Sequence, residues 1–181
     1  MRQREPETKN LQDMFKIEKL TLKNLSDFFE VFKEVLKTGF PEYSSQLVKF
    51  FIGKDCCEKV FVKKIKGDEW FVLVAKLNDK IIGFLVAENL YGGVSYAPWE
   101  GVIEELQRQG VGSKLIKSWE QEIKKIGGHK LALITQSQKN RQFFLKCGFK
   151  EEGFEEKSWF GLDCWKFGKV IGKPKPEVFL K

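Results

Sequence analysis

The segment Gln107-Arg108-Gln109-Gly110-Val111-Gly112 combines glycines and an arginine immediately before a helical pattern. A helix N-terminus leaves several main-chain N–H groups without partners inside the helix, and the helix dipole places partial positive charge there. Gly110 and Gly112 have no Cβ atom, so the main chain can approach phosphate oxygens closely. Arg108 and Lys114 would add positive charge at the rim. The segment therefore predicts a turn that binds an anion such as a pyrophosphate.

Other nucleotide-binding motifs do not fit this segment. A Rossmann dinucleotide site needs G-x-G-x-x-G, and Leu115 occupies the place of the third glycine. A Walker loop needs G-x-x-x-x-G-K-[ST], which the chain lacks. Taken by itself, the segment leaves an alternative open, which is a glycine turn that starts a helix and binds no anion.

The hydrophobic pattern around the turn predicts the elements that must position it. Apolar residues at three- and four-residue spacing predict helices, and alternating or continuous apolar runs predict strands. We expect strands at 15–20, 70–77, 80–88, 96–103, 130–135, 150–155 and 162–170. We expect helices at 26–37, 44–65 with an interruption at Gly53, 113–125 and 139–146, and a strand is the alternative for 60–65. This order is typical of a mixed sheet with helices on both faces.

Composition limits the class of protein. The chain has 181 residues, of which 42% are hydrophobic, and this suits one packed domain. Its net charge of +7 would suit a phosphate-bearing ligand, an acidic partner or nucleic acid, but the charges are scattered in the manner of a solvated surface. The charged first residues contain no signal sequence and no run is long enough to span a membrane, so we expect a cytoplasmic protein. The 4 cysteines and 1 histidine lack the spacing of a zinc site, so we expect reduced thiols and no metal.

A strand, the motif Q/R-x-x-G-x-G/A, an amphipathic helix and a buried strand together resemble the acetyl-CoA-binding core of GNAT acetyltransferases. The segment 137–149 (SQKNRQFFLKCGF) resembles the second signature of that family, N-x-x-A-x-x-x-Y-x-x-x-G-F, and its closing Gly148-Phe149 matches. The hairpin at 71–88 resembles the paired strands that precede the cofactor strand. The resemblance covers 70–155 well and 15–37 more weakly.

The resemblance implies an α/β fold, a three-layer αβα sandwich whose mostly antiparallel sheet of six or seven strands is splayed at a central parallel pair. It implies that pantetheine lies in that gap against the main chain of Val102, Ile103 and Glu104, and that N–H groups from Arg108 to Ser113 hold the pyrophosphate. A main-chain N–H group near the cofactor strand would polarise the thioester oxygen. The full set that it assigns to acetyl-CoA is Val102, Ile103, Glu104, Gln107, Arg108, Gln109, Gly110, Val111, Gly112, Ser113, Asn140 and Phe144.

The second signature departs from the family at two positions. Ser137 stands where the family has asparagine, and Phe144 stands where it has the tyrosine that often protonates the departing thiolate. A phenyl ring donates no proton, and loss of a general acid costs roughly 10²- to 10⁴-fold in rate. A thiol with a pKa of about 8.5 nevertheless leaves tolerably as its anion near neutral pH.

The resemblance also points to Glu100 as the general base, on the strand that leads into the turn. A solvated or ion-paired carboxylate is the alternative, and Glu104 is the second candidate base. We expect His129 to lie at the surface or in a cap and Cys147 to pack beside Gly148. Aromatic residues that could line an acceptor pocket, or belong to the core, are Tyr91, Tyr96, Trp99, Trp159 and Phe160.

Two functions from different classes follow. The first is an N-acetyltransferase that moves an acetyl group from acetyl-CoA to a primary amine on a small molecule, peptide or protein by direct attack. The second is a catalytically weak acyl-CoA-binding module that serves as a sensor or assembly subunit. We expect one domain over 13–170, a disordered arm over 1–12 and a tail over 171–181. We expect neither membrane nor nucleic acid as a partner, and a homodimer is left open.

Overall fold

The computed structural model describes residues 14–180, so the arm expected over 1–12 lies outside the described residues. The strands are β1 (Phe15–Lys19), β2 (Trp70–Leu77), β3 (Lys80–Glu88), β4 (Val94–Tyr96), β5 (Trp99–Val102), β6 (Lys130–Thr135), β7 (Lys150–Trp159) and β8 (Leu162–Val170). The helices are α2 (Leu25–Thr38), α3 (Ser45–Phe50), α4 (Glu58–Lys66), α5 (Val111–Lys125), α6 (Gln138–Lys146) and α7 (Pro176–Phe179). Shorter helical turns are η1 (Leu22–Asn24), η2 (Phe51–Asp55) and η3 (Glu104–Leu106).

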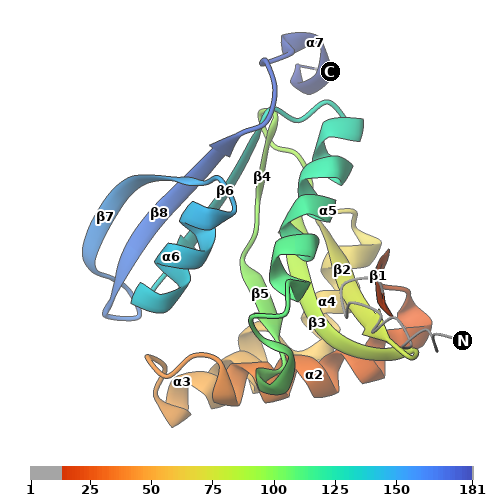
Figure 1. The fold of residues 1–181 in the computed structure, drawn as a ribbon, viewed down its shortest axis with the longest axis vertical. Coiled ribbons are helices and arrows are strands. Elements are labelled where there is room, and N and C mark those ends of the chain that lie inside the picture. The colour runs from red at the N-terminus through yellow and green to blue at the C-terminus, as the bar shows by residue number, and fades with distance from the viewer. Residues whose placement is uncertain (1–13, 181) are drawn as a thin grey trace, which may run out of the picture.

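The strands form two sheets of four that meet at β4 and β5. One sheet has the order β1-β2-β3-β5 and is antiparallel, and the other has the order β4-β6-β8-β7 with β4 and β6 parallel. Figure 1 shows the two sheets diverging from the region of β4 and β6, with the β7–β8 hairpin on one side and β1 to β3 on the other. The mixed, mostly antiparallel fold with a splayed parallel pair is confirmed.

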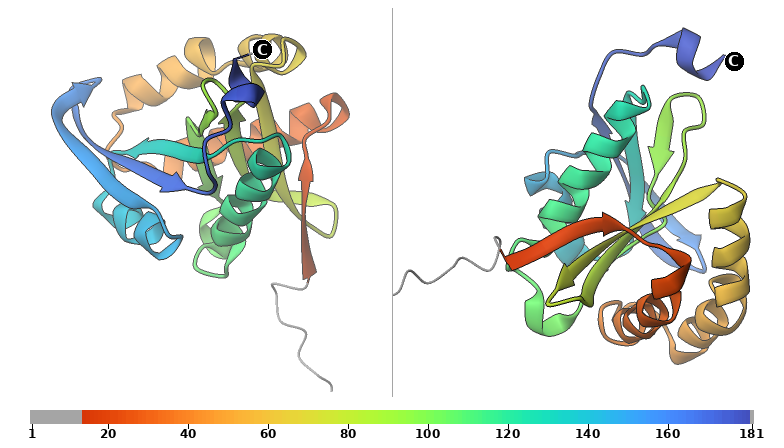
Figure 2. Two further views of the ribbon diagram at one scale, coloured as in Figure 1. Left: turned by 90° about the horizontal axis from the view of Figure 1, so that it is seen from above. Right: turned by 90° about the vertical axis from the view of Figure 1, so that its right-hand side faces the viewer.

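Helices cover both faces of the sheets. Alternation along β2 directs Val72 and Val74 toward α2 and α4, and directs Leu73 toward α5, with each face forming its own buried cluster. In the right panel of Figure 2, α5 lies on one side of the strands, and α2 and α4 lie on the other. The result is the three-layer arrangement that the sequence predicts.

The strand expected over 96–103 is in fact two strands, and this prediction was wrong in its continuity. Tyr96 pairs with Ala132 of β6, whereas Trp99 pairs with Val86 of β3. Between them lies Pro98, which has no N–H group to donate to a neighbouring strand. The chain therefore changes sheets at this point, and β5 and the last residues of β6 are left unpaired with each other.

The segment between α3 and α4 also differs from expectation. The interruption lies at Cys57, whose main chain is extended, whereas Gly53 lies inside the π-helical turn η2. In that turn the N–H of Cys56 donates to the carbonyl of Phe51 at 2.7 Å. The wider turn seats Phe51 in the aromatic cluster with Trp99 and Trp159, which explains why the helix continues past the glycine.

The C-terminal residues return to the body of the molecule. The N–H of Ile171 donates to the carbonyl of His129 at 2.8 Å, and α7 then places Phe179 5.7 Å from the His129 ring. His129 lies beside α7 and is half-buried there. No helix among residues 14–180 is both long and apolar enough to cross a bilayer.

Candidate active site

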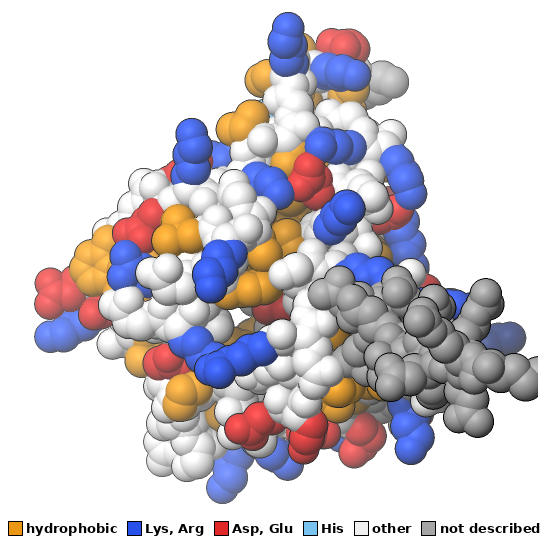
Figure 3. All heavy atoms as spheres, viewed as in Figure 1, with side chains coloured by type: hydrophobic (Ala, Val, Ile, Leu, Met, Phe, Trp, Pro, Cys, Tyr) orange, Lys and Arg blue, Asp and Glu red, His pale blue; other side chains and the backbone are white. Residues whose placement is uncertain are grey.

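A cleft of about 680 Å³ opens where β5, the turn before α5 and the start of α6 meet. In the space-filling view, the furrow between α5 and α6 has hydrophobic side chains in its floor and lysine and arginine side chains around it (Figure 3). Predicted site residues that line the cleft are Glu100, Val102, Gln107, Arg108, Gly110, Gly112, Ser113 and Asn140.

The turn before α5 presents main-chain donors. Arg108 and Gly110 have φ angles of 61° and 87°, so the chain reverses sharply into the helix. The first hydrogen bond of α5 runs from the N–H of Lys114 to the carbonyl of Gly110. Within residues 14–180, no hydrogen bond is found for the N–H groups from Arg108 to Ser113. These donors at a helix N-terminus form a site for an anion.

Gly112 is necessary for the shape of the cleft. A Cβ atom at this position would lie 2.9 Å from Oε1 of Glu100 and 3.0 Å from Cζ of Phe143. Both distances are shorter than ordinary van der Waals contacts. The glycine therefore allows the carboxyl of Glu100 and the ring of Phe143 to reach the first turn of α5.

Glu100 carries a strongly altered carboxyl. The residue is half-buried, and its side chain lines the cleft. Burial raises the pKa of Glu100 to about 7. A carboxyl with this pKa exchanges its proton near neutral pH, as a general base requires.

The exit of β5 is held by side-chain hydrogen bonds. Nε2 of Gln107 donates to the carbonyl of Val102 at 3.2 Å, and Nζ of Lys139 donates to Oε1 of Gln107 at 3.1 Å. The main-chain oxygen of Val102 thus lies at the cleft and accepts from an amide. A ligand amide could replace that side-chain amide without leaving the oxygen unpaired.

Residues 68–151 match the model of a family described as the acetyltransferase (GNAT) domain. The chain contains a GNAT acetyltransferase domain. A search of curated protein sequences found no match.

Solved structures share the fold of this GNAT domain. PaiA N-acetyltransferase from Thermoplasma acidophilum in complex with coenzyme A has a TM-score of 0.74 at 21% identity, over 86% of this chain and 98% of that one. The ribosomal-protein-S18-alanine N-acetyltransferase from Escherichia coli has a TM-score of 0.68 at 20% identity, over 90% and 97%. An aminoglycoside 6'-N-acetyltransferase complexed with coenzyme A has a TM-score of 0.66 at 18% identity, over 88% and 99%.

In this GNAT domain, α6 places two adjacent phenylalanines on different sides. Phe144 is buried and packs against Phe149 and Phe167, at ring-centroid distances of 5.9 Å and 5.8 Å. Phe143 lines the cleft. The position of the family's tyrosine is therefore occupied by a core residue, and its neighbour forms the wall of the site.

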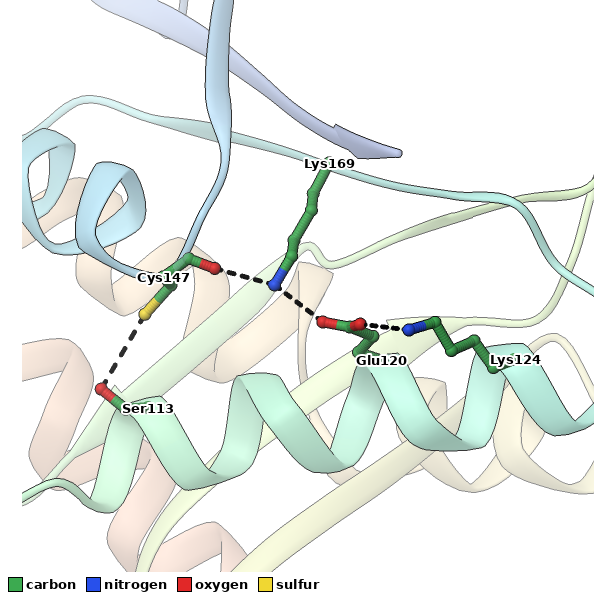
Figure 4. A network of polar contacts seen from close by, with 5 residues as sticks. All are labelled: Ser113, Glu120, Lys124, Cys147 and Lys169. Atoms are coloured by element: carbon green, nitrogen blue, oxygen red, sulfur yellow. Dashed lines mark hydrogen bonds and ion pairs between the residues drawn. The ribbon is translucent and has the colours of Figure 1, made fainter. Parts of the chain in front are cut away.

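A polar network joins α5 to the end of α6 and to β8 (Figure 4). Nζ of Lys169 donates to the carbonyl of Cys147 at 2.8 Å and pairs with Glu120 at 2.7 Å, and Sγ of Cys147 lies 3.9 Å from Oγ of Ser113. Although burial opposes the ionisation of Glu120, two lysines lower its pKa. The network fixes the C-terminus of α6 over the first turn of α5, and it accounts for Cys147 as a packed residue.

Several predicted residues lie elsewhere. Val111 is buried in the core, and Ile103 and Gln109 are outside the residues that line the cleft. Among the candidate acceptor aromatics, Tyr91 is 92% exposed and Trp99 is buried in the α2 face. None of the five candidate aromatics lines the cleft, whose aromatic residues among those described are Phe40 and Phe143.

Sequence reasoning missed other lining residues. Lys139 and Lys146 add positive charge beside the turn, and Val35 and Phe40 close the end of the cleft nearest to α2. The two lysines lie within the second signature and were available to sequence reasoning as a charge pattern. Val35 and Phe40 gave no local signal, because they come from α2 and the loop after it, far away in sequence. Among residues 14–180, no group of three potential metal ligands comes together.

Proposed function

We propose that this protein transfers an acetyl group from acetyl-CoA to a primary amine. The observation that carries the proposal is the turn before α5, whose N–H groups have no partner among residues 14–180 and whose residues Arg108, Gly110, Gly112 and Ser113 line the same cleft as Glu100. Transfer to an amine needs an anion site for the coenzyme and a base for the amine proton, and this cleft supplies both kinds of group.

The lining residues fit coenzyme A. The diphosphate would accept from the N–H groups of the turn, and Arg108, Lys139 and Lys146 would supply positive charge. The main chain at Val102 would pair with pantetheine amides along the unpaired edge of β5. Acetyl-CoA supplies the acyl group as an activated thioester.

Glu100 would hold the proton of the reaction. Its carboxylate removes a proton from the acceptor ammonium, directly or through water, and the neutral nitrogen then attacks the carbonyl carbon. A C–N bond forms, the C–S bond breaks, and the thiolate leaves with the coenzyme. Because Phe144 has no hydroxyl and faces the core, water would protonate the thiolate. The free thiols of the four cysteines suit a reducing compartment, and we place the reaction in the cytoplasm.

Calorimetric titration with coenzyme A tests the cofactor site. We expect binding that weakens about 10-fold in Arg108→Ala, because one charge-assisted contact to a phosphate is lost. Lys66→Ala is the matched control, since Lys66 is an exposed cation on α4, on the opposite face of the sheet. Absence of any heat of binding with the unmodified chain would refute the proposal.

A second function has one observation in its favour. Phe144 removes the family's usual proton donor and is packed in the core, which suits a module that binds acyl-CoA with little chemistry. Release of free thiol from acetyl-CoA with a panel of primary amines separates the two. Amine-dependent thiol release identifies an enzyme, whereas tight binding without release identifies a binding module.

A further inference from the structure

A second cleft of about 390 Å³ adjoins the first. It lies between the loop after α2, the exit of β5 and the segment that enters α6. Residues that line both clefts are Gly39, Gln107, Lys139 and Asn140. A molecule whose reacting end lies near Glu100 can therefore extend into the second cleft.

Glu42 gives this second cleft an unsatisfied acceptor. The residue lies in the loop after α2, and its Oε2 atom is shielded from solvent with no hydrogen-bond partner among residues 14–180. A shielded carboxylate oxygen without a donor costs free energy, and polar groups of this kind ordinarily have partners. The arrangement predicts a donor that arrives with a ligand.

Neighbouring side chains do not supply that donor. The hydroxyl of Tyr43 donates to Oε1 of Gln136 at 3.1 Å, and Nε2 of Gln136 approaches Sγ of Cys164 at 3.4 Å. Oε1 of Gln138 accepts from Arg141. These contacts engage the polar groups near Glu42 and leave its Oε2 atom to an incoming cation.

The carboxylates of the two clefts are also without ion pairs. Among the ion pairs of residues 14–180, lysines and Arg141 pair with carboxylates on the surfaces of the helices and sheets, but none pairs with Glu42, Glu100 or Glu104. Lys139 lies nearby and donates to Gln107. In a chain with a net charge of +7, Glu42, Glu100 and Glu104 thus offer carboxyl groups to a cationic ligand, beside the lysines that also line the clefts.

We propose that the acceptor is a linear diamine whose second ammonium group binds Glu42 while the first reacts near Glu100. This inference rests on the proposed acetyl transfer. The shielded position of Oε2 suits a slim, terminal ammonium on an unbranched chain, and the volume of the second cleft suits a small molecule. Glu104, which is exposed at the rim, adds long-range attraction.

The test compares 1,4-diaminobutane and 1,6-diaminohexane with n-butylamine, which has a single amine. At saturating acetyl-CoA, we expect kcat/KM to be at least about 10-fold higher for the better diamine than for n-butylamine. Glu42→Gln should lower kcat/KM for the diamine about 10- to 100-fold and leave n-butylamine unchanged, as expected for loss of one hydrogen-bonded ion pair. Glu105→Gln is the matched control, because Glu105 is the exposed neighbour of Glu104 and lines neither cleft.

A binding readout keeps this test separate from that of the proposed function. With coenzyme A bound, 1,4-diaminobutane or 1,6-diaminohexane should raise the melting temperature of the unmodified chain, and n-butylamine should not. If coenzyme A binds but the three amines act alike in turnover and in melting, the diamine inference is overturned and acetyl transfer stands. If coenzyme A itself fails to bind, acetyl transfer is what fails.

Discussion

Glu100 combines the proton-transfer role that we propose with a cost to stability in one carboxyl. Its side chain comes from β5, the strand that leads into the anion-binding turn, and contacts the position of Gly112 on α5. The pKa of this carboxyl is raised to about 7 by burial, with no charged group contributing. The same desolvation therefore disfavours the ionised carboxyl and would bring Glu100 into the range of a general base.

The rate of acetyl transfer should follow the ionisation of Glu100. The base acts in its deprotonated form, so kcat/KM should fall about 10-fold for each pH unit below about 7 and level off above it. Glu100→Gln should lower kcat by roughly 10²- to 10⁴-fold and remove this step from the pH profile. Both the pH profile and the loss of kcat are measured by following thiol release between pH 5.5 and 9 in the unmodified chain and in the variant. A profile that keeps its step in the variant would assign the proton transfer to another group.

Glu100 should also make the free energy of unfolding depend on pH. Its pKa is higher in the folded chain, so between pH 4.5 and about 7 the folded state holds the proton that the unfolded state has released. Stability therefore falls as pH rises through this window and is constant above it. Glu100→Gln should remove the fall and gain on the order of 3 kcal/mol at pH 8 relative to pH 4.

Urea unfolding of both chains at pH 4 and at pH 8 measures this difference. Glu105→Gln serves as the control, since Glu105 is exposed. Parallel pH dependence in the Glu100 variant and the unmodified chain would show that the carboxyl is solvated.

At the scale of the elements, the turn into α5 depends on the conformation of a single glycine. Gly110 has a φ of 87°, a region that costs a residue with a Cβ atom about 1–2 kcal/mol. If Gly110→Ala shifts the turn to relieve that strain, affinity for coenzyme A should fall about 5- to 30-fold.

Calorimetric titration with coenzyme A is again the measurement. Gly53→Ala is the matched control, because a Cβ atom at Gly53 would meet nothing within 4 Å and the residue has no positive φ. Equal affinity in the two variants would indicate that the turn does not hold the coenzyme.

Sequence predicted the elements with strong local signals. The turn at 107–112 was predicted because glycines at fixed spacing precede an amphipathic helix, and α2 and α5 begin and end within two residues of expectation. The break between β4 and β5 was not predicted, because strand-forming residues continue on both sides of Pro98. The break is set by tertiary structure, because β4 pairs with β6 whereas β5 pairs with β3.

Side-chain direction was the harder part of the site. Phe143 and Phe144 are adjacent and chemically identical, so a motif alone cannot tell which ring faces the cleft. The rotation of α6 is set by its packing on Phe149 and Phe167. Glu42 carries no local signal, because its role depends on a loop that packing brings to the exit of β5.

At the scale of the whole molecule, one buried hydrogen-bond chain connects both sheets to α5. Nε1 of Trp119 donates to Oγ of Ser95 at 3.0 Å, and Oγ of Ser95 donates to the carbonyl of Glu88. Trp119 is fully buried in the core between the helix and the sheets. The chain thereby holds the end of β3 close to β4, next to the point where the sheets separate.

Ser95→Ala should destabilise the fold by about 1–3 kcal/mol, since it leaves the indole N–H of Trp119 and the carbonyl of Glu88 without partners. Urea unfolding gives the free energy. Ser45→Ala, at the exposed first position of α3, should change it by less than about 0.5 kcal/mol. Equal stability of the two variants would mean that water replaces the lost hydroxyl.

The separation between β5 and the last residues of β6 has a consequence for how fast main-chain amides exchange in the protein without coenzyme A. Among residues 14–180, β5 pairs with β3 alone and β4 pairs with β6 only as far as Ala132, so each of these strand ends has one edge without a neighbouring strand. In deuterated water the amides on such an edge should exchange early. A pantetheine arm lying between them would act as a substitute strand, and added coenzyme A should slow exchange at 99–102 and 133–135 while the α7 end of the molecule is unaffected.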